Sequence, residues 1–208
     1  MQKLFQGSTD LDARHELDGL LPTSAVKVGP ATHRQLPDLV AIARREIPGV
    51  NVTEAALAQF LRSDPESIFA FERAGNPLGG IAFLYLNERG HDALLLDNID
   101  LKNPGFEFLA RGDEEVSAIY VWALACCGRA VVGLGNVAAY LRKPRFAGAD
   151  YFAQPSTTAG RDLLIAIGFK PTSSLKPDLW RYQRPWNRVP PDMPAAHFSA
   201  RSVADARH

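Results

Sequence analysis

Residues 114–142, EEVSAIYVWALACCGRAVVGLGNVAAYLR, form the stretch that decides the fold of this chain. Its first half is apolar, β-branched and aromatic, which is typical of a buried β-strand. The step Gly133-Leu134-Gly135 then opens a segment with the composition of a helix. A glycine turn between strand and helix presents free backbone N–H groups at the helix N-terminus, where the helix dipole favours negative charge. The sequence therefore predicts an anion site that suits the pyrophosphate of a nucleotide-like cofactor.

Two other interpretations of this stretch involve no such ligand. Without β-carbons, Gly133 and Gly135 would let a helix pack tightly against a strand. Residues 118–140 are also long enough to cross a membrane as a helix. Arg129 near the middle and the β-rich first half argue against a spanning helix. We therefore expect a soluble protein that does not bind membranes.

The composition excludes strong electrostatic steering toward nucleic acid. The 208 residues include 23 Lys or Arg and 23 Asp or Glu, so the formal net charge is zero. Cys126 and Cys127 are adjacent within the apolar run, where neighbouring side chains of a strand point to opposite faces. A disulfide between them is not expected, and the pair predicts a reducing compartment, the cytoplasm.

Composition divides the chain into three regions. Residues 1–24 are polar and mixed in charge, without the apolar core of a secretory signal, and predict a loosely ordered leader. Residues 185–208 are rich in proline and predict a tail without a core of its own. The intervening residues 25–184 predict one domain.

The periodicity of that domain indicates alternating elements of a mixed α/β fold. The sequence predicts strands at 26–28, 67–72, 78–86, 117–125, 149–153 and 178–183, with a short strand at 93–96 in an irregular segment. It predicts helices at 36–47, 54–62, 133–142 and 158–167, with hydroxyl caps at Thr53 and at 156–158.

Three features in this order resemble the GNAT (Gcn5-related N-acetyltransferase) superfamily over about residues 25–184. They are the strand 117–125 running into Gly133-Leu134-Gly135, the step Gly168-Phe169-Lys170-Pro171, and the pair of helices before the first hairpin. The resemblance implies a single GNAT-like domain, with a mixed, mostly antiparallel central sheet flanked by helices. It also implies acetyl-CoA or another acyl-CoA as the donor.

The resemblance further implies a cofactor site on the central strand and the turn after it. Main-chain groups of Ala123, Leu124 and Ala125 would pair with the pantetheine arm as an added strand does. The pyrophosphate would lie on the amides of the following turn, beside a basic side chain that Arg129 supplies one position early. The residues of that turn are Ala130, Val131, Val132, Gly133, Leu134, Gly135 and Asn136.

Transfer to an amine needs a base, because an ammonium group cannot attack a thioester. In the superfamily this base is often a carboxylate on the central strand, which points to Glu114 and Glu115 at the start of that strand. Tyr120 is a third candidate, as a proton donor or acceptor near the thioester. Solvated strand-end carboxylates and a core tyrosine are the structural alternatives for these residues.

Two positions depart from the family pattern. Ala130 stands where a basic or amide residue is usual in the cofactor loop, and Leu164 stands where many members have a tyrosine that protonates the leaving thiolate. Two alternatives to N-acetyl transfer therefore stay open: a catalytically silent module that binds acyl-CoA or a protein, and a transferase for longer acyl chains. Small residues at Gly79, Gly80 and Ala82 are compatible with the second.

The acceptor is left open between small amines, amino acids, peptides and aminoacyl-tRNA. Acidic residues in 87–113 favour a cationic acceptor, and the sequence is compatible with a homodimer. His33 and His91 are isolated, so we expect no metal site. Cys126 lacks an identifiable base nearby and is expected to be inert.

Overall fold

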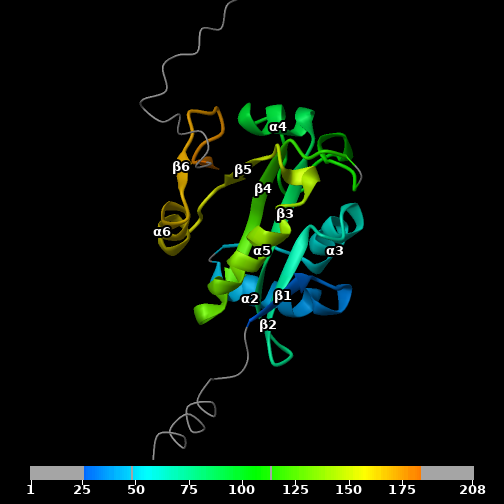
Figure 1. The fold of residues 1–208 in the computed structure, drawn as a ribbon, viewed down its shortest axis with the longest axis vertical. Helices are drawn as coiled ribbons and strands as arrows, with labels where there is room; N and C mark the ends of the chain where they lie inside the picture. The colour runs from blue at the N-terminus through cyan, green and yellow to red at the C-terminus, as the bar shows by residue number, and fades with distance from the viewer. Residues whose placement is uncertain (1–25, 48, 113, 184–208) are drawn as a thin grey trace, which may run out of the picture.

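A seven-stranded sheet organises the part of the chain that a computed structural model describes, residues 26–47, 49–112 and 114–183 (Figure 1). The strands are β1 (Lys27–Pro30), β2 (Ile68–Arg73), β3 (Asn76–Leu86), β4 (Ala118–Cys126), β5 (Asp150–Ala153), β6 (Phe169–Pro171) and β7 (Trp180–Tyr182). The α-helices are α2 (Leu36–Glu46), α3 (Glu54–Ser63), α4 (Glu88–Leu95), α5 (Leu134–Tyr140) and α6 (Thr158–Ala166). Single 3₁₀ segments are η1 (His33–Gln35), η2 (Phe106–Phe108), η3 (Gly128–Gly133) and η4 (Pro144–Phe146). The predicted leader, 1–24, and the predicted tail, 185–208, lie outside the described residues.

The strands lie in the order β1-β2-β3-β4-β5-β7-β6. Every neighbouring pair is antiparallel except β4 and β5, which run parallel. The predicted mixed, mostly antiparallel sheet flanked by helices is therefore confirmed. The parallel pair arises because α5 and its flanking turns carry the chain back to the start of β4 before β5 begins.

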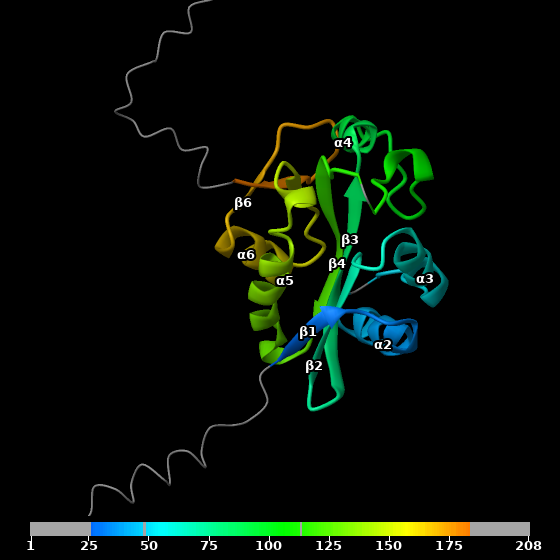
Figure 2. The ribbon, with the colours of Figure 1, turned by 45° about the vertical axis from the view of Figure 1, so that its right-hand side comes forward.

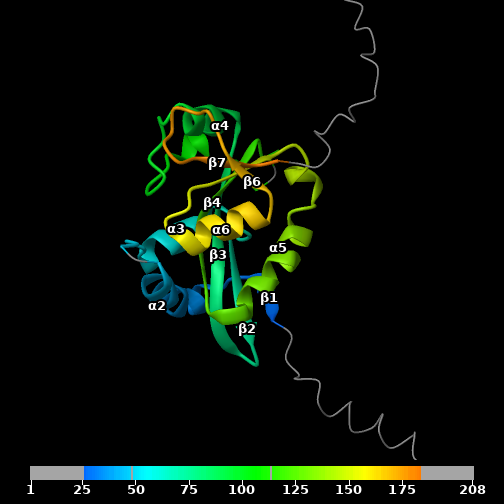
Figure 3. The same cartoon turned by 90° about the vertical axis from the view of Figure 1, so that its left-hand side faces the viewer.

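The sheet is covered on both faces. Along β4, Ala118 and Tyr120 belong to the core shared with α2 and α3, whereas Ile119 belongs to the core shared with α5. This is the two-residue alternation of a strand buried on both sides. In Figure 2 the helices α2 and α3 lie on one side of the sheet and α5 on the other, and Figure 3 shows α5 alongside the sheet with its start near β1.

The two helices before the first hairpin are confirmed with small changes at their ends. Buried residues of α2 recur at helical spacing: Leu36, Leu39, Val40, Ile42 and Ala43. The predicted cap of α3 is present, because the Thr53 hydroxyl accepts a hydrogen bond of 3.2 Å from the Ala56 N–H. Helix α2 thus lays its apolar stripe on β3 and β4, whereas α3 packs against β2 and, through Phe60, against Trp122 of β4.

The cap of α6 also forms as predicted, and it yields a stability test. The Thr157 hydroxyl accepts a hydrogen bond of 3.0 Å from the Gly160 N–H, which the first turn of the helix would otherwise leave without a partner. We expect Thr157→Ala to lower the free energy of unfolding by about 1 kcal/mol, measured by urea denaturation. Thr157→Ser keeps the acceptor oxygen and should retain most of the stability; equal losses in both variants would contradict the assignment.

The predicted strand at 93–96 is wrong, because this segment belongs to helix α4. The Asn87 side chain accepts a hydrogen bond of 2.9 Å from the Gly90 N–H and caps the helix. Gly90, Ala93 and Leu94 are its buried residues, at the spacing of one helical face. The apolar run that suggested a strand is therefore the buried side of a short helix, and the capping residue Asn87 is the sequence signal that could have identified it.

Strand β1 extends beyond its predicted end. The Gly29-Pro30 step was expected to stop it at residue 28, but Pro30 is the last residue of the strand. Since β1 pairs only with β2 and forms an edge of the described sheet, a residue without an N–H is tolerated there.

Candidate functional site

Strand β4 has an open edge along its second half. Its parallel pairing with β5 runs from Ala118 opposite Asp150 to Val121 opposite Ala153 and stops there. Strand β4 continues to Cys126, paired only with β3. Figure 1 shows β5 turning away from β4 toward α6. An extended group can therefore add to residues 122–126 by the backbone bonds that a strand would make.

A β-bulge marks the point where the edge opens. Ala82 of β3 lies opposite Ala123, but Phe83 lies opposite Val121, so Trp122 is an extra residue in β4. A bulge shifts the alternation of side chains by one position. Trp122 and Ala123 accordingly both pack against the core on the α2 and α3 side, although they are neighbours.

The register beyond the bulge decides which backbone groups face the open edge. The Cys127 N–H donates to Leu78 O at 2.8 Å, so Cys127 faces β3. In an antiparallel pair, residues alternate between facing the partner and facing away. Ala123 and Ala125 thus pair with β3, while Leu124 and Cys126 direct their N–H and C=O groups to the open side. Of the predicted trio, only Leu124 has backbone groups available there, and Cys126 joins it.

The turn after β4 differs from the predicted glycine turn. The 3₁₀ segment η3 begins at Gly128, whose positive φ of 54° makes the turn, and η3 leads directly into α5. Gly133 is the N-cap of α5, which confirms a helix start there, but its φ of −62° is that of an ordinary helical residue. The Leu134 N–H is shared between Val131 O and Val132 O. Free amides at the first helical turn are therefore expected near Gly128 instead of at Leu134.

The two predicted glycines have different surroundings. A β-carbon on Gly133 would lie 2.8 Å from Cγ2 of Val28, so this glycine packs against β1, as the packing interpretation requires. A β-carbon on Gly135 would meet no atom within 4 Å. Gly135 and Asn136 are exposed, as is Val132, whereas Ala130 is buried in the core. Gly135 therefore lies on a surface where a ligand can approach the backbone.

The predicted bases lie away from the open edge. Glu114 and Glu115 are exposed and precede β4 at the end that pairs with β5. The Glu114 carboxylate accepts a hydrogen bond of 3.0 Å from the Arg111 N–H and so stabilises a turn. At about 3.3 Å per residue, Ala118 and Trp122 alone are separated by roughly 13 Å along the strand. The structure does not bring these carboxylates to the opening between β4 and β5.

Tyr120 is buried beside the opening, and a chain of hydrogen bonds connects it to the other side. Its hydroxyl donates to Gln154 Oε1 at 2.9 Å, and Gln154 Nε2 donates to Pro177 O at 2.7 Å. Gln154 follows the last residue of β5, so this chain of hydrogen bonds spans the two strands where they separate. Burial raises the pKa of the Tyr120 phenol well above its usual range, which keeps the hydroxyl protonated as a donor. Sequence reasoning missed Gln154, since nothing in its neighbourhood signals a partner on another strand.

The raised pKa of Tyr120 predicts a pH-dependent contribution to stability. At neutral pH, Tyr120→Phe should cost about 1 kcal/mol through the lost hydrogen bond. Above about pH 10 the unfolded chain loses the phenol proton while the folded chain keeps it, so the wild type is destabilised as pH rises. The difference between wild type and Tyr120→Phe should therefore shrink between pH 7 and pH 11 in urea titrations. A difference that stays constant over this range would contradict the prediction.

The end of β4 is held to the end of α2. Arg45 Nη2 donates to Cys127 Sγ at 2.6 Å, and Arg45 Nε forms an ion pair of 2.8 Å with Glu46 Oε1. The hydrogen bond from Arg45 lowers the pKa of the exposed Glu46 carboxyl, which therefore remains ionised and is a weak base. Burial raises the pKa of the Cys126 thiol, as expected of an inert strand cysteine.

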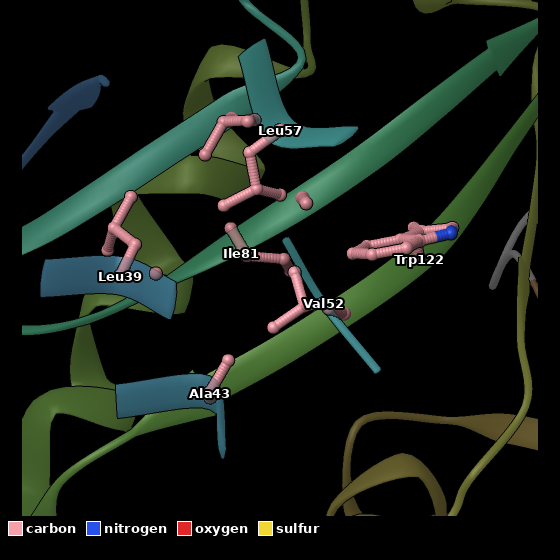
Figure 4. A pocket seen from close by; sticks show the side chains of 11 residues that line it. Leu39, Ala43, Val52, Leu57, Ile81 and Trp122 are labelled. Carbon is pink, nitrogen blue, oxygen red and sulfur yellow. The ribbon is translucent and has the colours of Figure 1, made fainter. Parts of the chain in front are cut away.

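An apolar pocket lies on the α2 and α3 side of the open edge (Figure 4). Leu39 and Ala43 reach it from α2, Leu57 from α3, and Trp122 from the bulge of β4. The pocket has a cavity volume of about 30 Å³. We call it the bulge pocket. It places hydrocarbon side chains directly beside the backbone that the opening exposes.

Two carboxylates of the acidic segment expected to attract a cationic acceptor are engaged elsewhere. Asp97 forms an ion pair of 2.6 Å with Lys176, and the Asp100 carboxylate accepts a hydrogen bond of 2.9 Å from the Lys102 N–H. Leu164, at the position of the family tyrosine, is buried against Phe169 and Trp180.

Within the described ranges, no group of three or more His, Cys, Asp and Glu side chains gathers as metal ligands would. None of the helices in those ranges combines the length and the apolar character needed to cross a bilayer.

The sequence matches no protein-family model and no curated protein. Among solved structures, the GNAT-like decarboxylase GphF in complex with isobutyryl-CoA is similar at 14% identity and a TM-score of 0.50, over 68% of this chain and 72% of that one. Ard1 from Thermoplasma volcanium has 15% identity and a TM-score of 0.49, over 77% and 99%. Naa50 from Arabidopsis thaliana, in complex with a bisubstrate analogue, has 14% and 0.48, over 75% and 95%. The sheet order, the single parallel pair and the likeness to GphF agree: the chain has the fold of the GNAT superfamily.

Proposed function

We propose that the protein binds an acyl-CoA along the open edge of β4 and transfers the acyl group to an amine. The observation that supports this most directly is the separation of β5 from β4 after Val121 and Ala153. It leaves residues 122–126 paired on one side only, beside an apolar pocket. A pantetheine arm is extended and carries two amides, so it can pair with backbone N–H and C=O groups as a strand does.

The residues at the open edge fit this ligand. Leu124 and Cys126 offer backbone donors and acceptors in the alternation that an added strand requires. The pyrophosphate would lie beyond the strand, near the η3 turn and the exposed backbone at Gly135. Arg129, in η3, remains the residue proposed to supply a positive charge to the pyrophosphate. The fit rests on backbone geometry and therefore tolerates Ala130 at a position where the superfamily usually has a longer side chain.

Bound acyl-CoA supplies a thioester carbonyl that an uncharged amine can attack. In the transfer, the nitrogen–carbon bond forms, the carbon–sulfur bond breaks, and the amine proton must leave while the thiolate gains one. An N–H group of the open edge would stabilise the negative charge that develops on the carbonyl oxygen. Glu114 and Glu115 remain the proposed bases, and from their distance to Trp122 they would have to act through a chain of several water molecules, because a single bridging water spans far less.

The experiment that tests the proposal is calorimetric titration of the whole chain with acetyl-CoA and with free CoA. We expect micromolar binding of both, followed by release of free thiol when amines from a panel are added to the acetyl-CoA complex. Failure of both compounds to bind would overturn the proposal.

A second candidate is a relative that binds acyl-CoA without transferring the acyl group. The burial of Leu164 and the remote position of the two glutamates favour it. It predicts the same titration result with no thiol release from any amine in the panel. Glu114→Gln and Glu115→Gln then separate the candidates, because a transferase should lose turnover at one of them while both variants keep their affinity for CoA.

A further inference from the structure

The bulge pocket adjoins the place where an acyl group would lie, which allows the acyl class to be inferred. Trp122, Ala123 and Ala125 line the pocket and also belong to the open length of β4. A ligand that follows this edge therefore has its terminal group next to the pocket. The inference rests on the function proposed above.

The side chains that line the pocket are hydrocarbon apart from the indole nitrogen of Trp122, which is already hydrogen-bonded. The Trp122 indole N–H donates to Leu101 O at 2.7 Å. Its ring packs edge-on against Phe60, with centroids 4.9 Å apart, so both ends of the side chain are fixed. No charged side chain lines the pocket. A carboxylate or an ammonium group placed there would lose its hydration without gaining a partner.

The size of the pocket limits the ligand. A cavity needs about 10–15 Å³ to hold one water-sized group. The volume of about 30 Å³ therefore holds two or three such groups. The space beside Gly80 of β3 is already filled, because a β-carbon there would lie 2.6 Å from Phe69 O and 3.0 Å from Leu39 Cδ2. The absence of a side chain at Gly80 thus serves close packing and does not open a long tunnel.

We propose that the bulge pocket receives the alkyl end of the acyl group and selects short, uncharged chains of about three to five carbons. Acetyl leaves most of the cavity unfilled. Chains of eight carbons exceed the cavity, and a succinyl group would bury a carboxylate without a partner. Each methylene that fills apolar space improves affinity by about fourfold. Butyryl-CoA, with two more methylenes, should therefore bind about 15-fold more tightly than acetyl-CoA.

Calorimetric titrations with CoA, acetyl-, butyryl-, octanoyl- and succinyl-CoA test the proposal. The variant is Leu57→Ala, which enlarges the pocket from α3. The matched control is Leu61→Ala on the same helix, which truncates an equally buried leucine that does not line the pocket. We expect the wild type and Leu61→Ala to prefer butyryl-CoA, and Leu57→Ala to shift the optimum to a longer chain. Thermal melts establish that both variants fold.

If Leu57→Ala does not fold, Ala43→Leu fills the pocket from α2 and should remove the advantage of butyryl over acetyl. Equal affinities for all acyl chains, with CoA binding intact, would overturn the acyl assignment while leaving the proposed function in place. The acyl assignment would also be overturned if Leu57→Ala changed the affinity for butylamine and left the affinities for all acyl-CoAs unchanged, because the pocket would then bind the acceptor. No binding of CoA or any acyl-CoA would overturn the proposed function and this inference together.

Discussion

Leu124→Pro is expected to weaken acyl-CoA binding by about 10- to 100-fold while the sheet remains intact. The register directs the Leu124 N–H away from β3, so proline removes a donor that the sheet does not use. A ligand carbonyl at that position would be buried without its partner, at a cost of about 1–3 kcal/mol. Calorimetric titration with acetyl-CoA measures the loss.

The matched control is Leu124→Ala, which truncates the same half-buried side chain and keeps the N–H. Both variants should lose stability from reduced packing, and only the proline variant should lose affinity beyond that of the alanine variant. Near-equal affinities would show that the ligand does not pair with Leu124. Ala125→Pro provides the opposite case, because it removes a donor that faces β3 and should disrupt the pairing of β3 with β4.

Replacement of the two glycines by valine should have opposite consequences. Gly133→Val places a side chain against Val28 and is expected to lower the free energy of unfolding by about 1–3 kcal/mol, as overpacking does. Gly135→Val meets no neighbouring atom and should change stability little, since valine has at least the helix propensity of glycine. It should instead weaken CoA binding about tenfold or more, by keeping the pyrophosphate from the backbone.

Urea denaturation and titration with CoA, performed on both variants, separate the packing and binding roles that the sequence alone left open. Gly135→Ala is the graded control, expected to have an intermediate affinity and at least the stability of the wild type. If Gly135→Val bound CoA as tightly as the wild type, the pyrophosphate would not lie on this surface. A stable Gly133→Val variant would show instead that β1 can move to accommodate a side chain.

The helices and strands of this fold were predictable where the hydrophobic pattern fitted a single type of element and turn or cap residues marked its ends. The hairpin of β2 and β3 was recognisable from two apolar runs that flank a turn at Ala74-Gly75, both of which have positive φ in the structure. The segment of α4 was misassigned because an apolar run of a few residues fits a strand and a buried helix face equally well. In this segment the helix-capping residue Asn87 is the feature that distinguishes a helix from a strand.

The candidate site was predictable as a region but not in its details. The strand and the following turn were identified from composition, whereas the bulge at Trp122 depends on how β4 pairs with β3. No pattern within β4 reveals that pairing. For the same reason, the sequence grouped Ala123, Leu124 and Ala125, although they face different sides. The contact of Tyr120 with Gln154 joins positions far apart in the chain, and single-sequence periodicity carries no information about it.

The bulge has a consequence for how the length of β4 can vary. Trp122 is the extra residue of the bulge, so deleting it would make the pairing regular, with Val121 opposite Phe83 followed directly by Ala123 opposite Ala82. Ala123 and Ala125 would still face β3, and Leu124 and Cys126 would still face the open edge. The strand can therefore lose one residue at this position and keep the orientation of its open edge, while the bulge pocket loses the indole that lines it.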